Sequence, residues 1–262
     1  MQNRTFTDQL NCEVSIPYPP ARIISLVPSQ TELLFYLGLD EEIVGLTKFC
    51  IHPDDKFKTV TKVGGTKKLN LNLIRNLKPD LIIGNKEEND RQQIEELTKE
   101  FPVWMSDIYD LDDAIDMISK VGSIVNREKK ALKLVLTIKS DFDELLKENS
   151  LGAGLRVAYF IWKDPLIIAA QGTFINDMLL RAGFENAFVL HRYPQVSAQD
   201  IQIAKPDYIF LSSEPYPFRD KHIKEFESIC PGARIIVVDG EMFSWYGSRL
   251  LMTPDYLKNL RL

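Results

Sequence analysis

Short apolar runs rich in β-branched residues alternate with helical stretches in the first part of the chain. These segments are residues 22–27, 31–38, 81–83 and 102–105. Strand-like runs that alternate with helices are typical of βα units and a mainly parallel sheet. Ser29 and Glu32 are spaced as in a capping box, so we expect a helix that starts at Ser29 and ends at Gly38.

The middle of the chain predicts one long helix. From residue 126 to 149, apolar side chains recur every three or four positions, with charged ones between them. At ~1.5 Å per residue, this helix would span roughly 36 Å, about the diameter of a small domain. The glycine-containing run 151–154 is expected to end it.

The second half of the chain repeats the plan of the first. The matched pairs are 22–27 with 156–161, 31–38 with 174–183, 78–83 with 205–210, and 101–107 with 233–239. Four matched elements in the same order indicate an internal duplication. We therefore predict an α/β protein with two similar Rossmann-like lobes joined by one long backbone helix. The expected parts are an N-terminal lobe at 1–110, linking helices at 111–152 and a C-terminal lobe at 153–262.

The composition is that of a globular protein. The 262 residues are 45% hydrophobic and 26% charged, which excludes a disordered or collagen-like chain. The net charge of −5, with no cluster of Lys or Arg, argues against a nucleic-acid partner or an anionic membrane surface. Cys12, Cys50 and Cys230 form no C-x-x-C pair, so neither a disulfide framework nor a thiolate zinc site is indicated.

The chain as written shows no targeting segment. Its longest apolar stretch, 33–39, is far shorter than the ~20 residues that cross a bilayer, and residues 1–20 hold no apolar signal core. We therefore expect a cytoplasmic location for the chain as written. If the chain has been trimmed, the expected location is periplasmic or otherwise extracytoplasmic.

Sequence motifs for catalysis are absent. The sequence has no dinucleotide-binding fingerprint, P-loop, nucleophile elbow or H-E-x-x-H pair, so we expect no enzyme and no cofactor. His52 and His191 are candidate ligand or metal contacts, but no third ligand is specified, so no metal site is predicted. His222 is expected on a solvated helix. Residues 63–68 resemble a phosphate-binding loop in composition but not in position, so a flexible loop is favoured.

Aromatic residues gather in the loops that follow predicted strands. In an open α/β sheet these loops are where ligands bind, and rings with polar tips suit a large, flat, partly apolar ligand. The segment 241–249 is especially rich in rings and also holds a carboxylate and an arginine. The predicted ligand-binding residues are Phe49, Trp162, Tyr193, Glu241, Trp245, Tyr246 and Arg249. A loop that packs into its own lobe is the alternative for 241–249.

Several segments carry a family resemblance that covers nearly the whole chain. They are residues 22–29 (RIISLVPS), 70–71 with 77–83 (NL and LKPDLII), 171–179 (QGTFINDML) and 193–197 (YPQVS). With these segments, the chain resembles the substrate-binding proteins of cobalamin and iron–siderophore ABC importers, the helical-backbone metal-receptor class. The resemblance implies a ligand cleft between the lobes. In cobalamin-binding members, aromatics and an acid hold the ligand at positions that fall here on Phe49, Tyr193 and Glu241.

The chain also departs from this family at four positions. Two tryptophans that line the cobalamin cleft fall here on Thr66 and Asn85. Two glutamates that dock on arginines of the permease fall on Asn72 and Gln199, each six residues before a Lys-Pro-Asp. An uncharged amide cannot form such a charge-assisted pair, so ordinary docking to a permease is in doubt.

These observations favour a non-enzymatic protein that binds a corrinoid or an iron–siderophore type of metal chelate, as in ABC importers. Two alternatives stay open: a direct metal-ion or haem receptor of the same fold, and a cytoplasmic corrinoid carrier without a permease. The expected partners are the small-molecule chelate and an ABC permease, and the chain is expected to be a monomer.

Overall fold

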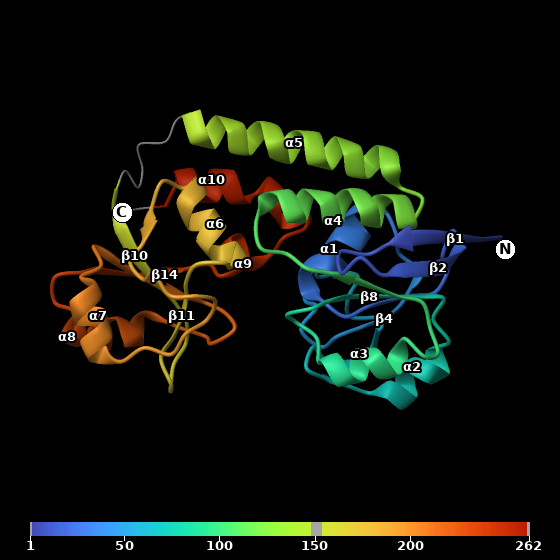
Figure 1. Ribbon diagram of the computed structural model, residues 1–262, viewed down its shortest axis with the longest axis horizontal. Helices are drawn as coiled ribbons and strands as arrows, with labels where there is room; N and C mark the ends of the chain where they lie inside the picture. The colour runs from blue at the N-terminus through green and yellow to red at the C-terminus, as the bar shows by residue number, and fades with distance from the viewer. Residues whose placement is uncertain (1, 148–153, 261–262) are drawn as a thin grey trace. The chain divides into compact units, whose positions relative to one another are not determined.

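The computed structural model describes residues 2–147 and 154–260, which form two compact units. Unit 1 comprises Met1–Ile108, Asp112–Thr137 and Tyr246–Arg249. Unit 2 comprises Tyr109–Leu111, Ile138–Trp245 and Leu250–Leu262. Figure 1 colours the chain by residue number, from blue at the N-terminus to red at the C-terminus.

Unit 1 is built mainly from βα units. Its strands are β1 (Gln2–Thr7), β2 (Glu13–Tyr18), β3 (Ile23–Ser25), β4 (Ile43–Leu46), β5 (Thr61–Lys62), β6 (Gly64–Gly65), β7 (Lys68–Leu69), β8 (Leu81–Asn85) and β9 (Val103–Ser106). Its helices are α1 (Pro28–Tyr36), α2 (Leu71–Leu77), α3 (Arg91–Leu97), α4 (Leu111–Ile124) and the first part of α5 (Glu128–Lys147).

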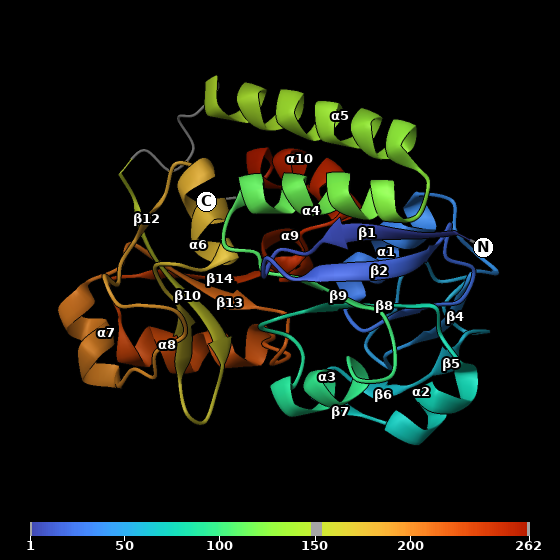
Figure 2. The ribbon, with the colours of Figure 1, turned by 45° about the vertical axis from the view of Figure 1, so that its right-hand side comes forward.

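Within the described part of unit 1, five strands form one sheet in the order β5-β4-β3-β8-β9, and all paired neighbours are parallel. Helices α2 and α3 lie on one side of this sheet, and α1 lies on the other (Figures 1 and 2). Strand and helix side chains such as Ile24, Ile82, Ile74 and Leu97 are fully buried together. Apolar strands with helices on both faces are the arrangement that the alternating pattern predicted.

Unit 2 repeats this plan. Its strands are β10 (Arg156–Trp162), β11 (Ile167–Ala169), β12 (Glu185–Asn186), β13 (Tyr208–Ser212) and β14 (Arg234–Val238). Its helices are the second part of α5, α6 (Phe174–Arg181), α7 (Ala198–Ala204), η1 (Asp220–His222), α8 (Ile223–Ile229), α9 (Glu241–Ser244) and α10 (Thr253–Lys258); the 3-10 turn η2 (Ser248–Leu251) is shared with unit 1.

The sheet of unit 2 follows the order β11-β10-β13-β14, with β12 also paired to β10. β10, β13 and β14 run parallel, while β11 returns antiparallel to β10. Helices α7 and α8 lie on one side and α6 on the other (Figures 1 and 2). Phe160, Ile201, Leu211 and Phe226 are fully buried in one cluster that joins the sheet to α7 and α8. The predicted α/β fold with two similar halves is confirmed.

The repeated Lys-Pro-Asp motif has the same structural role in both units. Lys78 and Lys205 end α2 and α7 in the left-handed region, at φ 47° and 46°. The carboxylate of Asp80 accepts hydrogen bonds of 2.8 Å from the backbone of both Ala21 and Arg22, just before β3. Asp207 likewise accepts from the backbone of Arg156, the first residue of β10, at 2.8 Å. The motif therefore joins a helix end to the start of the neighbouring strand.

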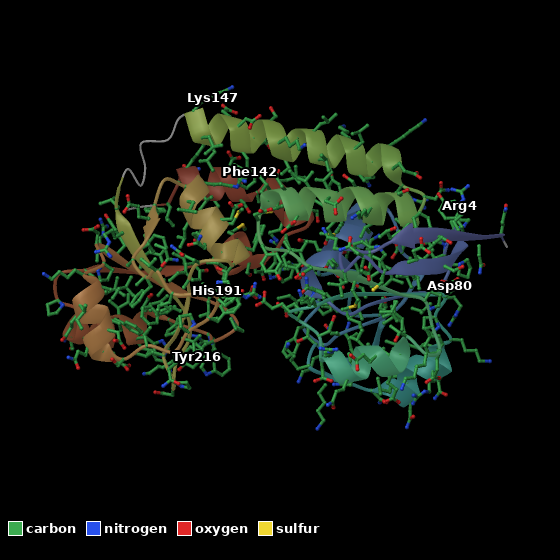
Figure 3. All side chains as sticks on the ribbon, in the orientation of Figure 1. Arg4, Asp80, Phe142, Lys147, His191 and Tyr216 are labelled. Carbon is green, nitrogen blue, oxygen red and sulfur yellow. The ribbon has the colours of Figure 1, made fainter. Side chains whose placement is uncertain are left out.

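The predicted long helix is α5, which has 20 residues within the part of the chain that the structure describes. It belongs to unit 1 as far as Thr137 and to unit 2 from Ile138. In unit 1 it packs closely on α4, because a Cβ atom at Gly122 would lie only 2.2 Å from that of Ala131. In unit 2 its buried residues include Phe142, which Figure 3 labels. Of the predicted helix end at 151–154, residues 151–153 lie outside the described residues, and Gly154 is exposed with a φ of +75°.

Two local expectations are wrong or incomplete. The predicted capping box at Ser29 does not form: Val27 is the N-cap of α1, Pro28 occupies the first turn, and no side chain caps the helix. The antiparallel β1–β2 hairpin was not predicted, because β1 carries mostly polar, exposed residues that give no apolar alternation. Of the described helices, none combines the length and the apolar content that a bilayer crossing requires.

Candidate functional site

Phe49 lies in unit 1 at the carboxyl end of a parallel strand, three residues after β4. Half of its side chain is exposed (50%). The ring lies against the β6–β7 hairpin at Gly65, where a Cβ atom would stand 3.2 Å from the ring atom Cε2. The ammonium of Lys48 lies 5.0 Å from the ring centroid. The hairpin and Lys48 therefore hold an exposed aromatic face at this edge of the sheet.

Thr66 and Asn85, the two positions in unit 1 where the family resemblance places tryptophans, have different surroundings. Thr66 is half-buried in the turn of the β6–β7 hairpin. Asn85 is buried at the end of β8, where its side chain accepts from the backbone of Glu87 and Glu88 and donates to Ser106. Asn85 thus stabilises the loop after β8, and little of its surface is exposed.

Trp162 is the last residue of β10 in unit 2, and its side chain is 40% exposed. It contacts Tyr216 edge-on, with ring centroids 5.7 Å apart, and Tyr216 in turn packs on Phe218 at 4.7 Å. Tyr216, labelled in Figure 3, lies in the loop that follows β13. Two strand ends thus support one partly exposed aromatic cluster, in which edge-on packing of the rings is favourable.

Tyr193 belongs to a second group of rings in unit 2. The guanidinium of Arg192 lies 5.6 Å from the ring of Tyr193 and 5.0 Å from the ring of Tyr109. Arg192 also donates to the backbone oxygen of Gly172 at 2.9 Å. Next to it, exposed His191 (Figure 3) sits so close to Gly172 that a Cβ there would lie 2.8 Å from the imidazole. Gly172, at φ +75°, is therefore required for this loop.

Glu241 and Trp245 lie on α9 and at its end, in unit 2. Glu241 is half-buried, whereas Trp245 is only 6% exposed. One carboxylate oxygen of Glu214 accepts from the indole of Trp245 and from the hydroxyl of Ser244, both at 2.8 Å. Burial raises the pKa of Glu214 above its usual value, and these two hydrogen bonds oppose the shift. Glu214 therefore fixes the orientation of Trp245.

The predicted site segment 241–249 is divided between the units. Tyr246 and Arg249 belong to unit 1, and each is 7% exposed. Arg249 donates to the carboxylate of Glu32 at 2.7 Å, within unit 1. Glu32, which the sequence pattern assigned to a capping box, therefore pairs with an arginine 217 positions away. Tyr246 and Arg249 offer little surface to a ligand in this structure.

The three histidines differ in their surroundings. His52 is half-buried in unit 1, and His191 is exposed in unit 2. The expectation that His222 is solvated is wrong: it is 6% exposed, its Nδ1 lies 2.9 Å from the backbone nitrogen of Arg219, and its ring packs on Tyr216 and Phe218. Among the described residues, no group of three His, Cys, Asp or Glu side chains is placed to hold a metal ion.

The two family docking positions are exposed and lie on short helices. Asn72 on α2 accepts a hydrogen bond from Arg75 at 3.3 Å. Gln199 lies on α7 beside Asp200, whose carboxylate forms the capping box with Ser197. These hydrogen bonds lower the pKa of Asp200. Asp200 is thus used in capping its own helix.

Sequence reasoning missed Lys48, Glu214, Arg192 and Tyr109. Each lies in a loop that follows a strand or packs on such a loop, so the same strand-end argument that selected Phe49 and Trp162 could have selected them. The sequence-based selection covered histidines, some strand-end aromatics and the segment 241–249, and it left out Tyr109 and the charged neighbours of the selected rings. A search for charged residues next to the selected aromatics would have found Lys48 and Arg192.

Comparison with known sequences gives a match over most of the chain. A model of the family described as periplasmic binding protein matches residues 23–228. The vitamin B12-binding protein of Pectobacterium carotovorum subsp. carotovorum (strain PC1) is 26% identical over 243 residues, which cover 91% of this chain and 87% of the relative.

Solved structures are similar over nearly the whole chain. The periplasmic vitamin B12-binding protein BtuF of Vibrio cholerae superposes with a TM-score of 0.80 at 23% identity, covering 92% of this chain and 98% of that one. A possible iron-binding (periplasmic solute-binding) protein of Staphylococcus epidermidis gives a TM-score of 0.77 at 27% identity, with coverages of 93% and 98%.

The expectation of a cytoplasmic location is wrong. It rested on the N-terminal residues of the chain as written. The matching family is described as periplasmic, and both similar structures are periplasmic proteins. The location of the family therefore overrides what the first residues indicated.

Proposed function

The chain belongs to the periplasmic binding protein family, and we propose that it captures a metal chelate of the corrinoid, haem or iron–siderophore kind for an ABC importer. Its relatives include a protein named for binding vitamin B12 and one described as a possible iron-binding protein. In this role the chelate is bound and released unchanged, outside the cytoplasm, by a monomer that performs no reaction.

One observation carries the proposal: each unit exposes a large aromatic ring at the carboxyl end of a parallel strand. Phe49 is 50% exposed in unit 1, and Trp162 is 40% exposed in unit 2. Such rings are held in place by neighbours, namely the β6–β7 hairpin and Tyr216. Rigid exposed rings at this edge suit a large apolar ligand, because burying them on binding is favourable and costs little side-chain freedom.

The proposed binding residues have two kinds of role. Phe49, Trp162 and Tyr193 provide apolar surface, and Glu241 provides a polar contact. The proposed role of Trp245, Tyr246 and Arg249 is to support the site, because their side chains are buried. Glu214 holds Trp245 and Glu32 holds Arg249 by hydrogen bonds. These hydrogen bonds hold the segment 241–249 in place.

The proposed permease contact differs from that of the family. Asn72 and Gln199 present neutral amides, which form hydrogen bonds but no ion pairs with a transporter arginine. Docking of this chain on its permease would therefore depend less on salt than docking through glutamates.

Ligand titration tests the proposed function. Intrinsic fluorescence would be followed with cyanocobalamin, cobinamide, haemin and a ferric siderophore, after correction for absorption by the ligand. Trp162 is the exposed tryptophan, while Trp104 and Trp245 are buried, so we expect Trp162 to dominate the saturable quenching. Saturation at micromolar concentration by one chelate supports the function. Saturation by Fe³⁺ alone would support the metal-ion alternative.

Matched variants then locate the binding surface. Phe49→Ala and Trp162→Ala are each expected to weaken binding by about 1 kcal/mol or more, roughly fivefold, as measured by equilibrium dialysis. Ile203→Ala on α7 is the control, because Ile203 is 70% exposed but lies on a helix away from the carboxyl strand ends. Unchanged affinity in both aromatic variants would remove these residues from the site.

A further inference from the structure

An open cavity of about 920 Å³ lies in unit 1 beside Phe49, and its lining is basic. The charged residues that line it are Lys48, Lys67, Lys68 and Arg75. No aspartate or glutamate is among the described residues of the lining. The whole chain is acidic, with a net charge of −5, so this concentration of positive charge is local.

The four cations of this cavity are not equivalent. The guanidinium of Arg75 lies 2.5 Å from a carboxylate oxygen of Glu96 and 2.7 Å from one of Glu100, which compensate its charge. Lys67 donates instead to the backbone oxygens of Glu87 and Asn89, which orient the ammonium without neutralising it. In the described part of the chain, neither Lys67 nor Lys48 forms an ion pair.

The β6–β7 hairpin brings these two lysines to the same cavity as Phe49. Lys67 occupies the turn of the hairpin, and Gly65 in β6 lacks the Cβ that would crowd the Phe49 ring. Lys48 lies beside the same ring. The charge of Lys67 is one of the influences, after the hydrogen bonds from Gln93, that lower the pKa of Asp90. One face of the cavity nevertheless combines an exposed apolar ring with two ammonium groups that form no ion pair, a combination that fits a ligand with an apolar body and an anionic edge.

We propose that the cargo is an anionic metal chelate whose carboxylates pair with Lys48 and Lys67 while its apolar body lies on Phe49. This inference rests on the proposed function and narrows it, because it favours carboxylate-bearing chelates over neutral corrinoids and neutral siderophores. Residues 63–68, which resembled a phosphate-binding loop in composition only, supply part of the anion-binding surface.

Four probes test the charge preference by equilibrium dialysis at low and high salt. Haemin and ferric dicitrate carry carboxylates, whereas ferrichrome and cyanocobalamin are neutral overall. We expect haemin or ferric dicitrate to bind most tightly, with affinity that falls as salt rises. Which of these two binds identifies whether the carboxylates belong to a porphyrin or to a citrate-type siderophore.

Charge variants connect this preference to the two lysines. The double variant Lys48→Gln and Lys67→Gln is expected to lose about tenfold or more in affinity for the anionic probe and to lose its salt dependence. Lys48→Arg with Lys67→Arg should retain binding. Lys99→Gln, an exposed change of the same charge outside the cavity, should bind as the parent does.

The outcomes distinguish failure of the anionic-cargo inference from failure of the proposed function. If cyanocobalamin or ferrichrome binds most tightly and the double variant binds it equally well, the anionic cargo is wrong while the proposed function stands. If none of the four chelates binds, the proposed function fails and this inference fails with it. If Lys99→Gln loses haemin binding to the same extent as the double variant, the loss reflects the overall charge of the protein, and the proposed anion-binding site is wrong.

Discussion

Glu214, a partly buried carboxylate, makes the stability of the fold depend on pH. It accepts hydrogen bonds from Trp245 and Ser244, and burial raises its pKa. A raised pKa means that the folded protein holds this proton more tightly than the unfolded chain does. Between the usual value of 4.5 and the raised value, the folded state is protonated and the unfolded state is ionised. The free energy of unfolding therefore falls as pH rises through this window.

Replacing Glu214 tests this sign. Glu214→Gln keeps an oxygen that accepts from Trp245 but removes the titration, so its stability should fall less steeply with rising pH above 4.5. One group contributes a slope of at most about 1.4 kcal/mol per pH unit. Urea unfolding at a series of pH values measures the difference. The exposed change Glu227→Gln is the control, and identical slopes for parent and Glu214→Gln would contradict the expectation.

At the scale of single residues, the sequence indicated which residue types to consider but not how deeply each side chain is buried. Trp162 and Trp245 were both expected beside the ligand, but the first is 40% exposed and the second 6%. Burial of a residue at the end of a strand or helix depends on which distant segment packs over it, and local sequence does not contain that information. Glu32 was misassigned for the same reason, since its partner Arg249 is far away in sequence.

Packing between elements depends on small residues at close crossings. Gly122 on α4 and Ala131 on α5 are both buried, and a Cβ at Gly122 would lie 2.2 Å from that of Ala131. A contact this short forces the two helices apart. The packing of α5 in unit 1 therefore requires glycine at position 122.

Gly122→Ala should lower the free energy of unfolding by about 1–3 kcal/mol. Adding Ala131→Gly should recover part of the loss, because it removes the opposing methyl group. Gly232→Ala is the matched control, since no atom lies within 4 Å of its Cβ position. Equal denaturation midpoints for the two single alanine variants would show that the helices separate at no cost.

Hydrophobic periodicity predicted most elements, because buried parallel strands and amphipathic helices leave strong patterns. The strands β3, β8, β9, β10, β13 and β14 and the helices α1, α5 and α6 all lie where the pattern placed them. The pattern failed where an element is exposed or brief. Strand β1 has no buried residue, and β6 and β7 have two residues each.

For the molecule as a whole, duplication and motifs predicted both the fold and the family. The match over residues 23–228 and the similar solved structures confirm them. The predicted location was wrong, because it rested on the N-terminal residues alone, whereas the matching family is described as periplasmic. Which ligand is bound could not be predicted, because it depends on side chains that the turns and loops of each unit bring together.

Ligand binding should stabilise the folded chain. A ligand that binds only the folded state adds about 2.7 kcal/mol at a concentration one hundred times its Kd. We expect the chelate that quenches Trp162 to raise the melting temperature, with an increase that grows with ligand concentration. Differential scanning fluorimetry with an external dye measures this. A chelate that quenches but leaves the melting temperature unchanged would be binding nonspecifically.

The Lys-Pro-Asp motifs and the exposed rings lie at opposite ends of the sheet strands. In β10, Asp207 holds the first residue, Arg156, while Trp162 is the last. Asp80 holds the approach to β3 in the same way, and Phe49 follows the other end of its neighbour β4. Substitutions that change the surface around the exposed rings can therefore accumulate at one end of each half without weakening the hydrogen bonds of Asp80 and Asp207 at the other end. Because each half has its own Asp contact at the start of a strand, substitutions at the ring-bearing end of one half leave the scaffold of the other half intact.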